Sequence, residues 1–419
     1  MRTDGSLKEI SLEKLYEVSF VLFVISRIMF TYTHLPDLLG AGVSGVLEDG
    51  LLLCALGLLA LVIWRYKSPK NTFILLILGF GIIGLSYVNS RASNLFMSAL
   101  FFYYSGVVRD KKGFATLVIR LYTAIILLLA ALSLCGLIDL SVTQRTRSTA
   151  IRSSLGFVHP NQLAMMAFVM ICMIFYRGME NRRRNRDMDY IIAGILMVVV
   201  FLITNTMTFL ALAFLLFVPL FAYDAVLSHF SMSRKATRHF VRMGLAVIGL
   251  VAGFFVYHFW KNPLALKGAL VTFRARFLLS QKYIAAYGIQ PFGSRIVVGT
   301  DVVIPGFERG YYYLDNGYIR LFVENGLLAG LIVVFLLMRA IVNLTRHSKW
   351  KLLVILLCFM LYVFNEQKIL TLYFNPFWVL LREYMLPARK LRVKSLTLTL
   401  PASMIDGGQN HSTEAGESQ

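Results

Sequence analysis

Long apolar runs separated by short charged clusters make up most of the chain. A helix that crosses the hydrocarbon core of a membrane needs about 20 predominantly apolar residues. By this criterion we expect about twelve transmembrane helices, at approximately 16–33, 46–64, 72–89, 93–108, 114–138, 160–176, 189–204, 206–223, 242–259, 318–338, 351–365 and 369–385. The seventh and eighth come from one run that we divide at the polar residues 204–206, and Asn375-Pro376 interrupts the last.

The composition supports this interpretation. Of the 419 residues, 58% are hydrophobic and 15% are charged, and the mean hydropathy is +0.68. A soluble domain is about half apolar and about a quarter charged. We therefore expect an all-α polytopic integral membrane protein, with a membrane domain at 1–394. The polar tail at 395–419 contains Gly and Ser, and we expect it to be disordered and cytoplasmic.

The positive charge of the chain, +20 overall, is distributed in short clusters between the apolar runs. This is typical of loops that orient helices, so no nucleic-acid partner is expected. If the N-terminus is inside, 27 of the 42 lysines and arginines lie on the inner side, 12 on the outer side and three within spans. The positive-inside rule then predicts that both termini are cytoplasmic, and that the loops at about 140–160 and 260–317 are extracytoplasmic.

Both predicted outer loops are rich in arginine, although their orientation does not require it. The arginines are Arg145, Arg147, Arg152, Arg274, Arg276 and Arg295. A guanidinium group is planar and permanently charged, and it can bind phosphate through two parallel hydrogen bonds. Two such loops facing each other would bind a diphosphate head group. The alternative is that the arginines pair with lipid phosphates or with carboxylates of the loops.

The first loop ends in His159, Pro160 and Asn161, directly before an apolar helix. Pro160 suits a first helical turn, where backbone N–H groups can bind an anion. His159 is a candidate for proton transfer or for donating a hydrogen bond to phosphate. A structural cap or an interfacial hydrogen bond is the alternative for this histidine.

The second loop contains FRARFLLSQKYIAAYGIQPFGSR, which predicts an amphipathic helix closed by a Pro-Phe-Gly turn. We expect its apolar residues to lie on the membrane surface, with Lys282 facing lipid head groups.

Four polar residues lie at the entry to the tenth span: Asp315, Tyr318, Arg320 and Glu324. Ionisable groups at this depth are costly and by default indicate a function. Arg320 and Glu324 are four residues apart on a helix, so they can neutralise one another. Asp315 has no such local partner, which makes it the better candidate for a general base.

Two further features receive structural interpretations. Gly326-x-x-x-Gly330 most simply predicts close helix packing. Arg27, within the first span, is expected to snorkel or to pair, for instance with Glu48 or Asp49.

Three segments resemble bacterial O-antigen polymerase and ligase-type membrane proteins, especially the repeat-unit polymerases of Gram-positive exopolysaccharide and capsule clusters. RSSLGFVHPNQLA, from Arg152 to Ala164, resembles their Arg…Gly-Phe-x-His-Pro-Asn element. RFLLSQKYIAAYGIQPFG resembles an outer-loop helix that begins at an arginine and closes at a Pro-Phe-Gly turn. Arg276 fits that arginine better than Arg274.

The third segment, DNGYIRLFVENGLLAG, resembles the start of the following span in this family. In lipopolysaccharide ligases this motif begins with a histidine and ends in Glu-x-Gly. Here Asp315 stands at the histidine position and Asn316 follows it, while Glu324 and Gly326 match the end. The missing histidine favours the polymerase branch.

The resemblance implies a GT-C-like fold and a metal-independent inverting transfer that needs no cofactor. A growing glycan would leave undecaprenyl diphosphate and join the terminal sugar of another lipid-linked repeat unit, outside a bacterial plasma membrane. Arg152 and Arg276, helped by Arg147, would bind the diphosphate. Asp315 would be the leading base, with Glu324 or His159 in reserve. The secondary site residues are Asn161, Arg274, Asn316, Tyr318 and Arg320.

The expected partners are an undecaprenyl-diphosphate-linked oligosaccharide and membrane lipids, together with a chain-length regulator and a flippase of the same pathway. Three other functions remain open at this point. A ligase would move finished polymer to another cell-surface acceptor. A flippase or transporter would be expected to show repeated halves and charges spread through its core. A scaffold without catalytic activity would leave the two basic loops unexplained.

Overall fold

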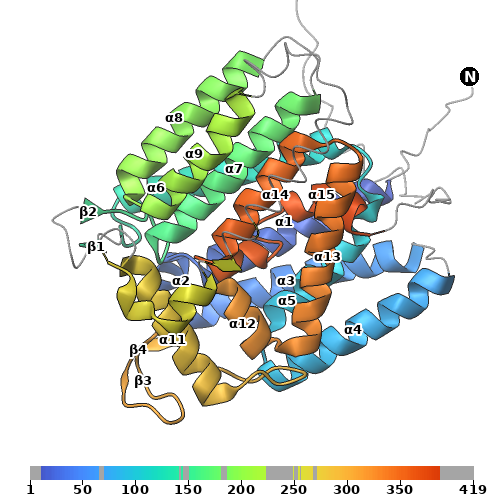
Figure 1. Cartoon of the computed structure of the whole chain (residues 1–419). Helices are drawn as coiled ribbons and strands as arrows, with labels where there is room; N and C mark the ends of the chain where they lie inside the picture. Colours follow the sequence, from blue (N-terminus) through green and yellow to red (C-terminus); the bar gives the residue numbers. More distant parts are fainter. Residues whose placement is uncertain are drawn as a thin grey trace, which may run out of the picture.

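The computed structural model describes residues 11–65, 70–140, 143–144, 151–180, 186–222, 249, 253–254, 256–267 and 271–386 (Figure 1). Most of this part of the chain is helical. Among the described residues, five helices are long and apolar enough to cross a membrane: α3 (Ala41–Arg65), α6 (Lys111–Leu134), α7 (Pro160–Glu180), α8 (Arg186–Thr204) and α13 (Gly326–Arg346). The expectation of a helical membrane protein is confirmed.

The remaining elements are shorter or more polar. Among the described residues, the other helices with both ends defined are α1 (Leu12–Thr31), α2 (Leu35–Leu39), α4 (Lys70–Ser90), α5 (Ser93–Tyr104), α9 (Met207–Ala222), α11 (Val271–Tyr287), α12 (Gly317–Glu324), α14 (Trp350–Val363) and α15 (Phe377–Met385). Three 3-10 turns are η1 (Ser105–Val107), η3 (Pro263–Ala265) and η5 (Gln367–Leu370).

Two small antiparallel sheets lie in the two predicted outer loops, where no strand was expected. The first pairs β1 (Thr143–Gln144) with β2 (Ile151–Arg152). The second pairs β3 (Gly299–Val302) with β4 (Gly310–Tyr312). These strands have only two to four residues, which is too short for an alternating pattern to be recognised in the sequence.

Most of the predicted spans coincide with helices. The first eight agree with helices of the structure to within a few residues, the usual uncertainty of helix boundaries. The span predicted at 242–259 lies mostly outside the described residues, and so does the tail at 395–419.

The span predicted at 318–338 is two helices, α12 and α13, because the chain turns sharply at Gly326. This glycine has φ +91°, a conformation that residues with a Cβ rarely adopt. A Cβ added there would lie 2.3 Å from the backbone nitrogen of Gly293, and one added at Gly330 would lie 2.5 Å from the ring of Phe322 in α12. The two glycines therefore pack α13 against a turn and against α12, rather than against a second long helix.

The span predicted at 369–385 is also interrupted. After η5 the chain is not helical again until α15, which Pro376 precedes. Proline has no N–H to donate inside a helix and suits the start of one, so the new helix begins directly after it. All residues from Thr371 to Leu381 are buried. This segment is part of the protein core rather than an independent lipid-facing span.

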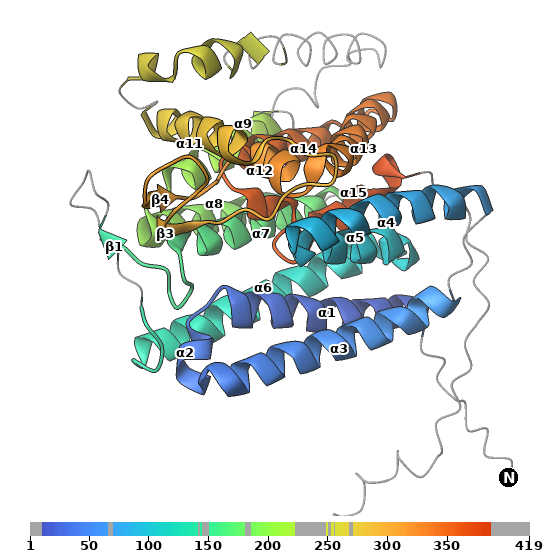
Figure 2. The same cartoon turned by 90° about the horizontal axis from the view of Figure 1, so that it is seen from below.

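Helix α7 is the centre of the bundle. In its most apolar stretch, 89% of the residues are buried inside the protein, compared with 17–33% in the other four membrane-length helices. Helices α6, α8 and α9 pack around it (Figure 1), and α13 contacts both α14 and α15. Figure 2 shows α1 and α3 as a closely packed pair on the far side of α6 from α7, α8 and α9.

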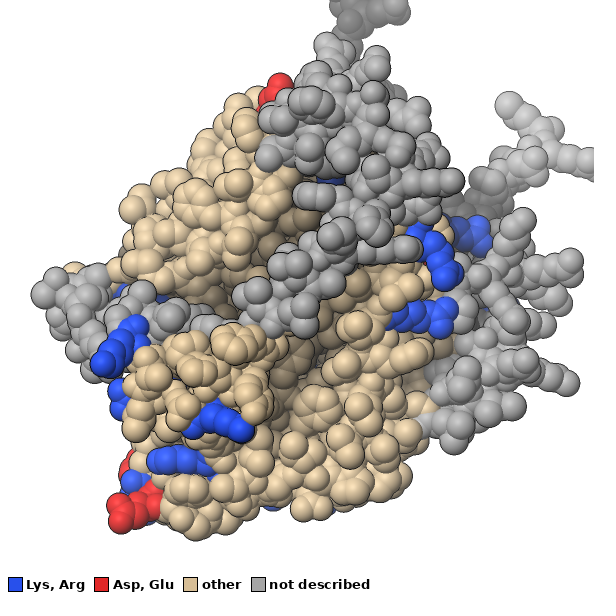
Figure 3. Space-filling model, in the orientation of Figure 1, with Lys and Arg blue, Asp and Glu red and all other residues tan. Residues whose placement is uncertain are grey.

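The charges of the described residues lie mainly at the two ends of the bundle. Over the face seen in Figure 3, a broad uncharged area separates basic groups near α11, β3 and β4 from basic groups at the opposite edge. Charged side chains are costly next to lipid tails, so this distribution agrees with a membrane-embedded middle. Within it, Arg27 pairs with Glu48 at 2.9 Å, which confirms one of the predicted partners.

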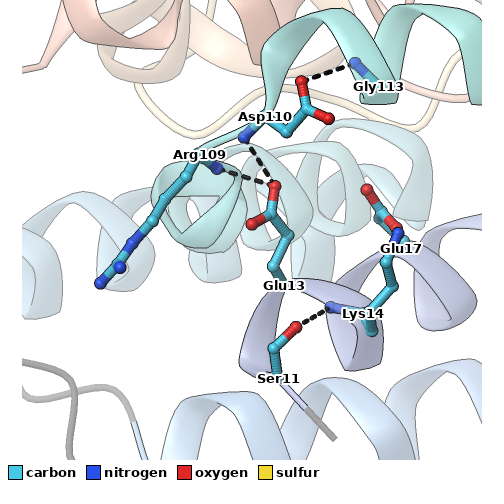
Figure 4. Close-up of polar contacts among 7 residues, drawn as sticks. All are labelled: Ser11, Glu13, Lys14, Glu17, Arg109, Asp110 and Gly113. Atoms are coloured by element: carbon cyan, nitrogen blue, oxygen red, sulfur yellow. Dashed lines mark hydrogen bonds and ion pairs between the residues drawn. The ribbon is translucent and has the colours of Figure 1, made fainter.

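At the end away from the two loops, polar contacts join α1 to the start of α6 (Figure 4). The carboxylate of Glu13 accepts hydrogen bonds from the backbone N–H groups of Arg109 and Asp110, at 2.9 and 2.8 Å. Asp110 in turn caps α6 by accepting a hydrogen bond from the N–H of Gly113 at 2.8 Å. The acidic groups here satisfy backbone donors that a helix start leaves unpaired.

Candidate functional site

The two predicted outer loops lie at the same end of the bundle (Figure 1). We call it the loop end and define it as residues 151–159, α11 with the chain that follows it to residue 316, and residues 366–370. The first of these segments is fixed to two helices by its backbone. Hydrogen bonds join Val158 to Tyr32 (3.1 Å), His34 to Gly156 (2.9 Å) and Ser153 to Ile203 (2.9 Å). The tight turn between them uses positive φ angles at Leu155 (+47°) and Gly156 (+83°). The position of His159 is therefore set by α1 and α8 together.

Arg152 is bound to the protein itself. Its Nε donates to the carbonyl of Thr204 at 2.8 Å, and one terminal nitrogen donates to Asn161 Oδ1 and Thr206 Oγ1, at 3.0 and 3.1 Å. The two threonines flank the break between α8 and α9. These bonds fasten the loop to the break and orient Asn161. They favour a positioning role for Arg152, and its predicted contact with diphosphate stays a prediction.

His159 is held in one tautomer by its neighbour. Its Nδ1 accepts a hydrogen bond from the backbone N–H of Asn161 at 3.1 Å, so the ring proton is on Nε2. The surrounding protein and the positive charges of Arg152 and Lys368 lower the pKa of His159 to about 4, against a smaller opposing effect of Glu366. The residue nevertheless keeps an exposed edge. At neutral pH the ring is uncharged, with Nδ1 occupied by the Asn161 N–H and Nε2 carrying the proton, and its low pKa makes it a weak proton acceptor; all three points argue against His159 as the reserve base.

Helix α11 is the helix predicted for the long loop, and it turns its large apolar side chains towards protein. Phe277, Ser280 and Tyr283 recur every three residues on its buried face. These side chains pack against the protein. They are therefore not the part of the helix that would contact the membrane surface, although that contact was expected of its apolar residues. Lys282, on the exposed side, lies over the rings of Phe307 and Tyr312, at 5.4 and 5.3 Å from their centroids.

Arg276 lies on the same helix and has an unsatisfied donor. Its Nε is buried without a hydrogen-bond partner among the described residues, and the hydroxyl of Ser280, one turn later, is in the same situation. Within the described part of the chain, Arg276 forms no ion pair. Buried polar groups are normally paired, and each exception calls for an explanation such as a bound ion or water. A phosphate oxygen is the kind of acceptor that would satisfy this guanidinium.

The Pro-Phe-Gly turn after α11 docks on the break between α12 and α13. Backbone hydrogen bonds run from Leu327 to Gln290 (2.9 Å), from Leu328 to Pro291 (3.1 Å) and from Ser294 to Val323 (3.0 Å). Gly293 has φ +80°, and a Cβ on it would lie 2.0 Å from the carbonyl oxygen of Glu324. Two of the segments that carry the family resemblance thus lock together. This contact fixes α11, with Arg276, relative to α12, with Asp315 before it.

The residues around Asp315 have mainly structural partners. The side chain of Asn316 caps α12 by accepting hydrogen bonds from the N–H groups of Tyr318 and Ile319, at 3.2 and 3.3 Å. The hydroxyl of Tyr318 donates to the carbonyl of Met360 in α14 at 2.9 Å. These two secondary residues therefore position the start of α12.

The carboxylate of Asp315 accepts no hydrogen bond and forms no ion pair with any residue that the structure describes. Burial and the negative charge of Glu366 raise the pKa of Asp315 to about 6, although Arg276, Lys368 and Arg320 act in the opposite direction. A carboxyl group with this pKa is half ionised near pH 6 and mostly ionised at neutral pH, so it can both accept and release a proton close to the operating pH. That is the condition that general base catalysis favours, because the ideal pKa lies near the operating pH.

Glu324 is not available in the same way. Arg320 binds both of its oxygens, with Nε at 2.8 Å and a terminal nitrogen at 3.1 Å. Both side chains are mostly buried. The mutual neutralisation weighed from the sequence is confirmed, so Glu324 is a poor candidate for the base.

Two site residues were missed from the sequence: Glu366 and Lys368. Glu366 is 8% exposed, and within the described residues its carboxylate has neither an ion pair nor a hydrogen bond. Both residues act electrostatically on Asp315 and on His159. They connect the two loops. The available signal was a charged pair in the short polar break between two apolar runs.

The packing of α12 explains how η5 reaches Asp315. A Cβ on Gly317 would lie 2.7 Å from the carbonyl oxygen of Val363 and 2.8 Å from Cα of Gln367. Only a glycine lets the start of α12 approach the end of α14 and η5 so closely. Because Gly317 has no side chain, the start of α12 lies close to η5, and Asp315, two residues before this glycine, lies closer to Glu366.

Lys368 is placed by two neighbours. Its Nζ lies 5.0 Å from the ring centroid of Tyr32, at the end of α1. In the amide orientation that satisfies both groups, Gln162 accepts from this Nζ at 3.1 Å and donates to the carbonyl of Tyr32 at 2.9 Å. Neither contact neutralises the ammonium, so its charge remains available at the loop end.

The other predicted residues are less informative. Arg147 lies outside the described residues, as does Arg145. Arg274 is half-buried on α11, two residues before Arg276. In the ranges that the structure describes, no three His, Cys, Asp or Glu side chains are grouped so that they could hold a metal ion.

Comparison with models of protein families, with curated proteins and with solved structures finds no match to this chain. Its function is therefore inferred from the residues at the loop end.

Proposed function

We propose that this protein is a membrane glycosyltransferase that polymerises a polysaccharide. It transfers a growing glycan from undecaprenyl diphosphate to a lipid-linked repeat unit. One observation carries the proposal: at the loop end, the carboxylates of Asp315 and Glu366 share electrostatic range with Arg276 and Lys368, yet none of the four forms an ion pair within the described residues. Charged groups that lie close together without ion pairs are typical of a site that binds a charged substrate.

The chemistry of the transfer matches these groups. The acceptor hydroxyl oxygen forms a bond to the anomeric carbon of the donor sugar, and the bond from that carbon to the diphosphate oxygen breaks. Asp315 takes the hydroxyl proton. The leaving diphosphate keeps the bonding electrons, and Arg276 and Lys368 stabilise its charge. His159 is placed to donate its Nε2 proton as a hydrogen bond to phosphate, while Arg152 holds the loop that presents it.

The proposal includes a more detailed membrane topology than the five membrane-length helices by themselves indicate. We propose about twelve spans in a bacterial plasma membrane, both termini cytoplasmic and the loop end on the outer face. The 27 lysines and arginines counted on the inner side support this orientation. A lipid-linked oligosaccharide is then the substrate, and a flippase and a chain-length regulator of the same pathway are the expected partners.

The test is a strain lacking this gene, complemented with the wild type, Asp315→Asn or Arg276→Ala. The proposal expects both variants, present at wild-type level, to lose long glycan and to accumulate single lipid-linked repeat units on the outer leaflet. Normal chain length in both variants would overturn the assignment. Units trapped on the inner leaflet would indicate a flippase instead. Full-length free polymer that fails only to reach a cell-surface acceptor would indicate a ligase.

A further inference from the structure

The chain leading to Asp315 alternates between two environments. Tyr312, Leu314 and Asn316 are 5%, 1% and 3% exposed, and the first two belong to a small apolar cluster with Tyr283 and Ile304. The residues between them point the other way: Tyr311 is 60% exposed and Tyr313 is 36% exposed. This is the period-two pattern of an extended strand. Tyr311, Tyr313 and Asp315 therefore share one face of the segment.

The two outward tyrosines form a continuous aromatic surface. Their ring centroids are 4.9 Å apart and their planes are tilted by 42°. Neither hydroxyl forms a hydrogen bond with a residue that the structure describes. Tyr312, between them, is instead anchored in the fold, with its hydroxyl donating to the carbonyl of Glu308 at 2.8 Å. The middle ring builds the core and the outer two remain free to contact a ligand.

This aromatic surface adjoins the charged residues of the site. Tyr311 lies within electrostatic range of both Asp315 and Arg276. Exposed aromatic rings next to convergent polar groups are a usual feature of ligand sites. A pyranose ring has one face of C–H groups, which carry a slight positive charge, and the face of an aromatic ring is negative. Stacking leaves the sugar hydroxyl groups at the rim, where a carboxylate can reach one of them.

We propose that Tyr311 and Tyr313 form a stacking platform for a sugar ring, and that this ring belongs to the acceptor glycan. The choice of acceptor over donor follows from the position of the platform on the same face as Asp315, which takes the proton of the acceptor hydroxyl. This inference rests on the proposed function. Tyrosines at a membrane surface also contact lipid head groups, so lipid contact is the competing explanation.

The test measures binding directly, by saturation-transfer difference NMR on the full-length protein in lipid nanodiscs. The probe is a mixture of oligosaccharides released by partial acid hydrolysis from the surface polysaccharide of the bacterium that carries the gene. Five proteins are compared: wild type, Tyr311→Ala, the Tyr311→Phe/Tyr313→Phe double variant, Asp315→Asn and Tyr257→Ala. Tyr257 is a matched control, 61% exposed and near Lys261 on another segment.

We expect saturation transfer to ring C–H protons of the sugar in the wild type, in the Phe double variant and in Tyr257→Ala. Tyr311→Ala should reduce the signal about fivefold, as expected for the loss of one aromatic contact. Asp315→Asn should keep the signal, because stacking does not need the base. Because Tyr311 is largely exposed, its replacement leaves the packed core intact, and a monodisperse gel-filtration peak verifies this.

Two results would overturn the platform: no transfer to the wild type, or an undiminished signal in Tyr311→Ala. The second result would leave lipid head groups, not a sugar, as the contact of these rings. Failure of the proposed function is seen separately, as normal glycan length in cells that carry Asp315→Asn.

Discussion

The two ends of this bundle use carboxylates in opposite ways. At the end shown in Figure 4, the Glu13 carboxylate accepts two backbone N–H groups and Asp110 caps a helix, so each has a structural bond. At the loop end, Asp315 and Glu366 accept no hydrogen bond from the described residues. The first arrangement stabilises the fold. The second leaves charge unused, which a protein tolerates where a substrate supplies the missing partner.

The ends also differ in what holds the backbone. The loop end is fastened by main-chain contacts, such as those of the Pro-Phe-Gly turn with Leu327 and Leu328. The side chains of Arg276, Asp315 and Glu366 therefore need not stabilise the fold through ion pairs with the described residues. Substitutions there should separate into two classes: side-chain changes that affect activity and glycine changes that affect the fold.

The largest expected effect is on catalysis. Asp315→Asn should lower glycan elongation at least about 100-fold, the usual contribution of a general base. The same change should raise the unfolding temperature at pH 7. A carboxyl whose pKa is raised by folding destabilises the protein above that pKa, and asparagine cannot ionise. The measurements are elongation in membranes and thermal unfolding of purified protein.

Asp301→Asn is the control for this prediction. Asp301 is exposed on the same loop and pairs with Arg309 at 3.3 Å. It should leave both activity and unfolding temperature unchanged. Equal activity loss in the two variants would remove the distinction between paired and unpaired carboxylates.

The next effect is on the fold. Gly326→Ala should destabilise the protein by about 3 kcal/mol, because the glycine combines a strained φ with direct backbone contact. Gly57→Ala in α3 should change stability by less than about 0.5 kcal/mol, since a Cβ there meets no atom within 4 Å. Unfolding in denaturant or heat, followed in nanodiscs, compares the two. Similar values would mean that the docked turn does not hold the loop end.

A smaller effect concerns pH. With the pKa of Asp315 at about 6, elongation at pH 5 should be about tenfold slower than at pH 7, because the base must be ionised. Glu366→Gln removes a negative charge that raises the pKa of Asp315, so the acid limb of the profile should move to lower pH. Each profile is normalised to its own plateau. An unmoved limb in Glu366→Gln would show that the two carboxylates do not interact.

The smallest effect belongs to the opposite end. Glu13→Gln should cost about 1 kcal/mol of stability through weaker hydrogen bonds to the N–H groups of Arg109 and Asp110. The activity of the folded fraction should be unchanged. Thermal unfolding and elongation per folded protein test this. A specific loss of activity would contradict the purely structural role assigned to this end.

The sequence predicts the membrane-length helices well, since a long apolar run carries its own signal. It also predicts the helix with Arg276, its closing turn and the Arg320–Glu324 pair, all of which depend on local spacing. It fails at the break at Gly326 and at the buried segment before α15, because tertiary contacts decide both. The small strands are too short to show a period.

The residues of the site can be predicted only in part from the sequence. Asp315 is recognisable because no partner lies near it in sequence. Glu366 is not, since its role comes from the approach of η5 to α12 at Gly317. Arg152 is prominent in its motif, but only the fold reveals that its guanidinium is tied to Thr204, Asn161 and Thr206. Residues that act through distant segments have no signature in a single sequence.

The docking of Gly293 on the backbone of Glu324 closes a loop from residue 293 to residue 324, whose outer part, residues 294–314, leaves the helices and returns to them at one place. Lengthening a loop that is already closed costs little, because closure entropy grows slowly with loop length. Its outer part can therefore change in size and sequence without moving Arg276 or Asp315. On the proposed function, a change of glycan then requires a change of this rim only, while the charged groups keep their spacing.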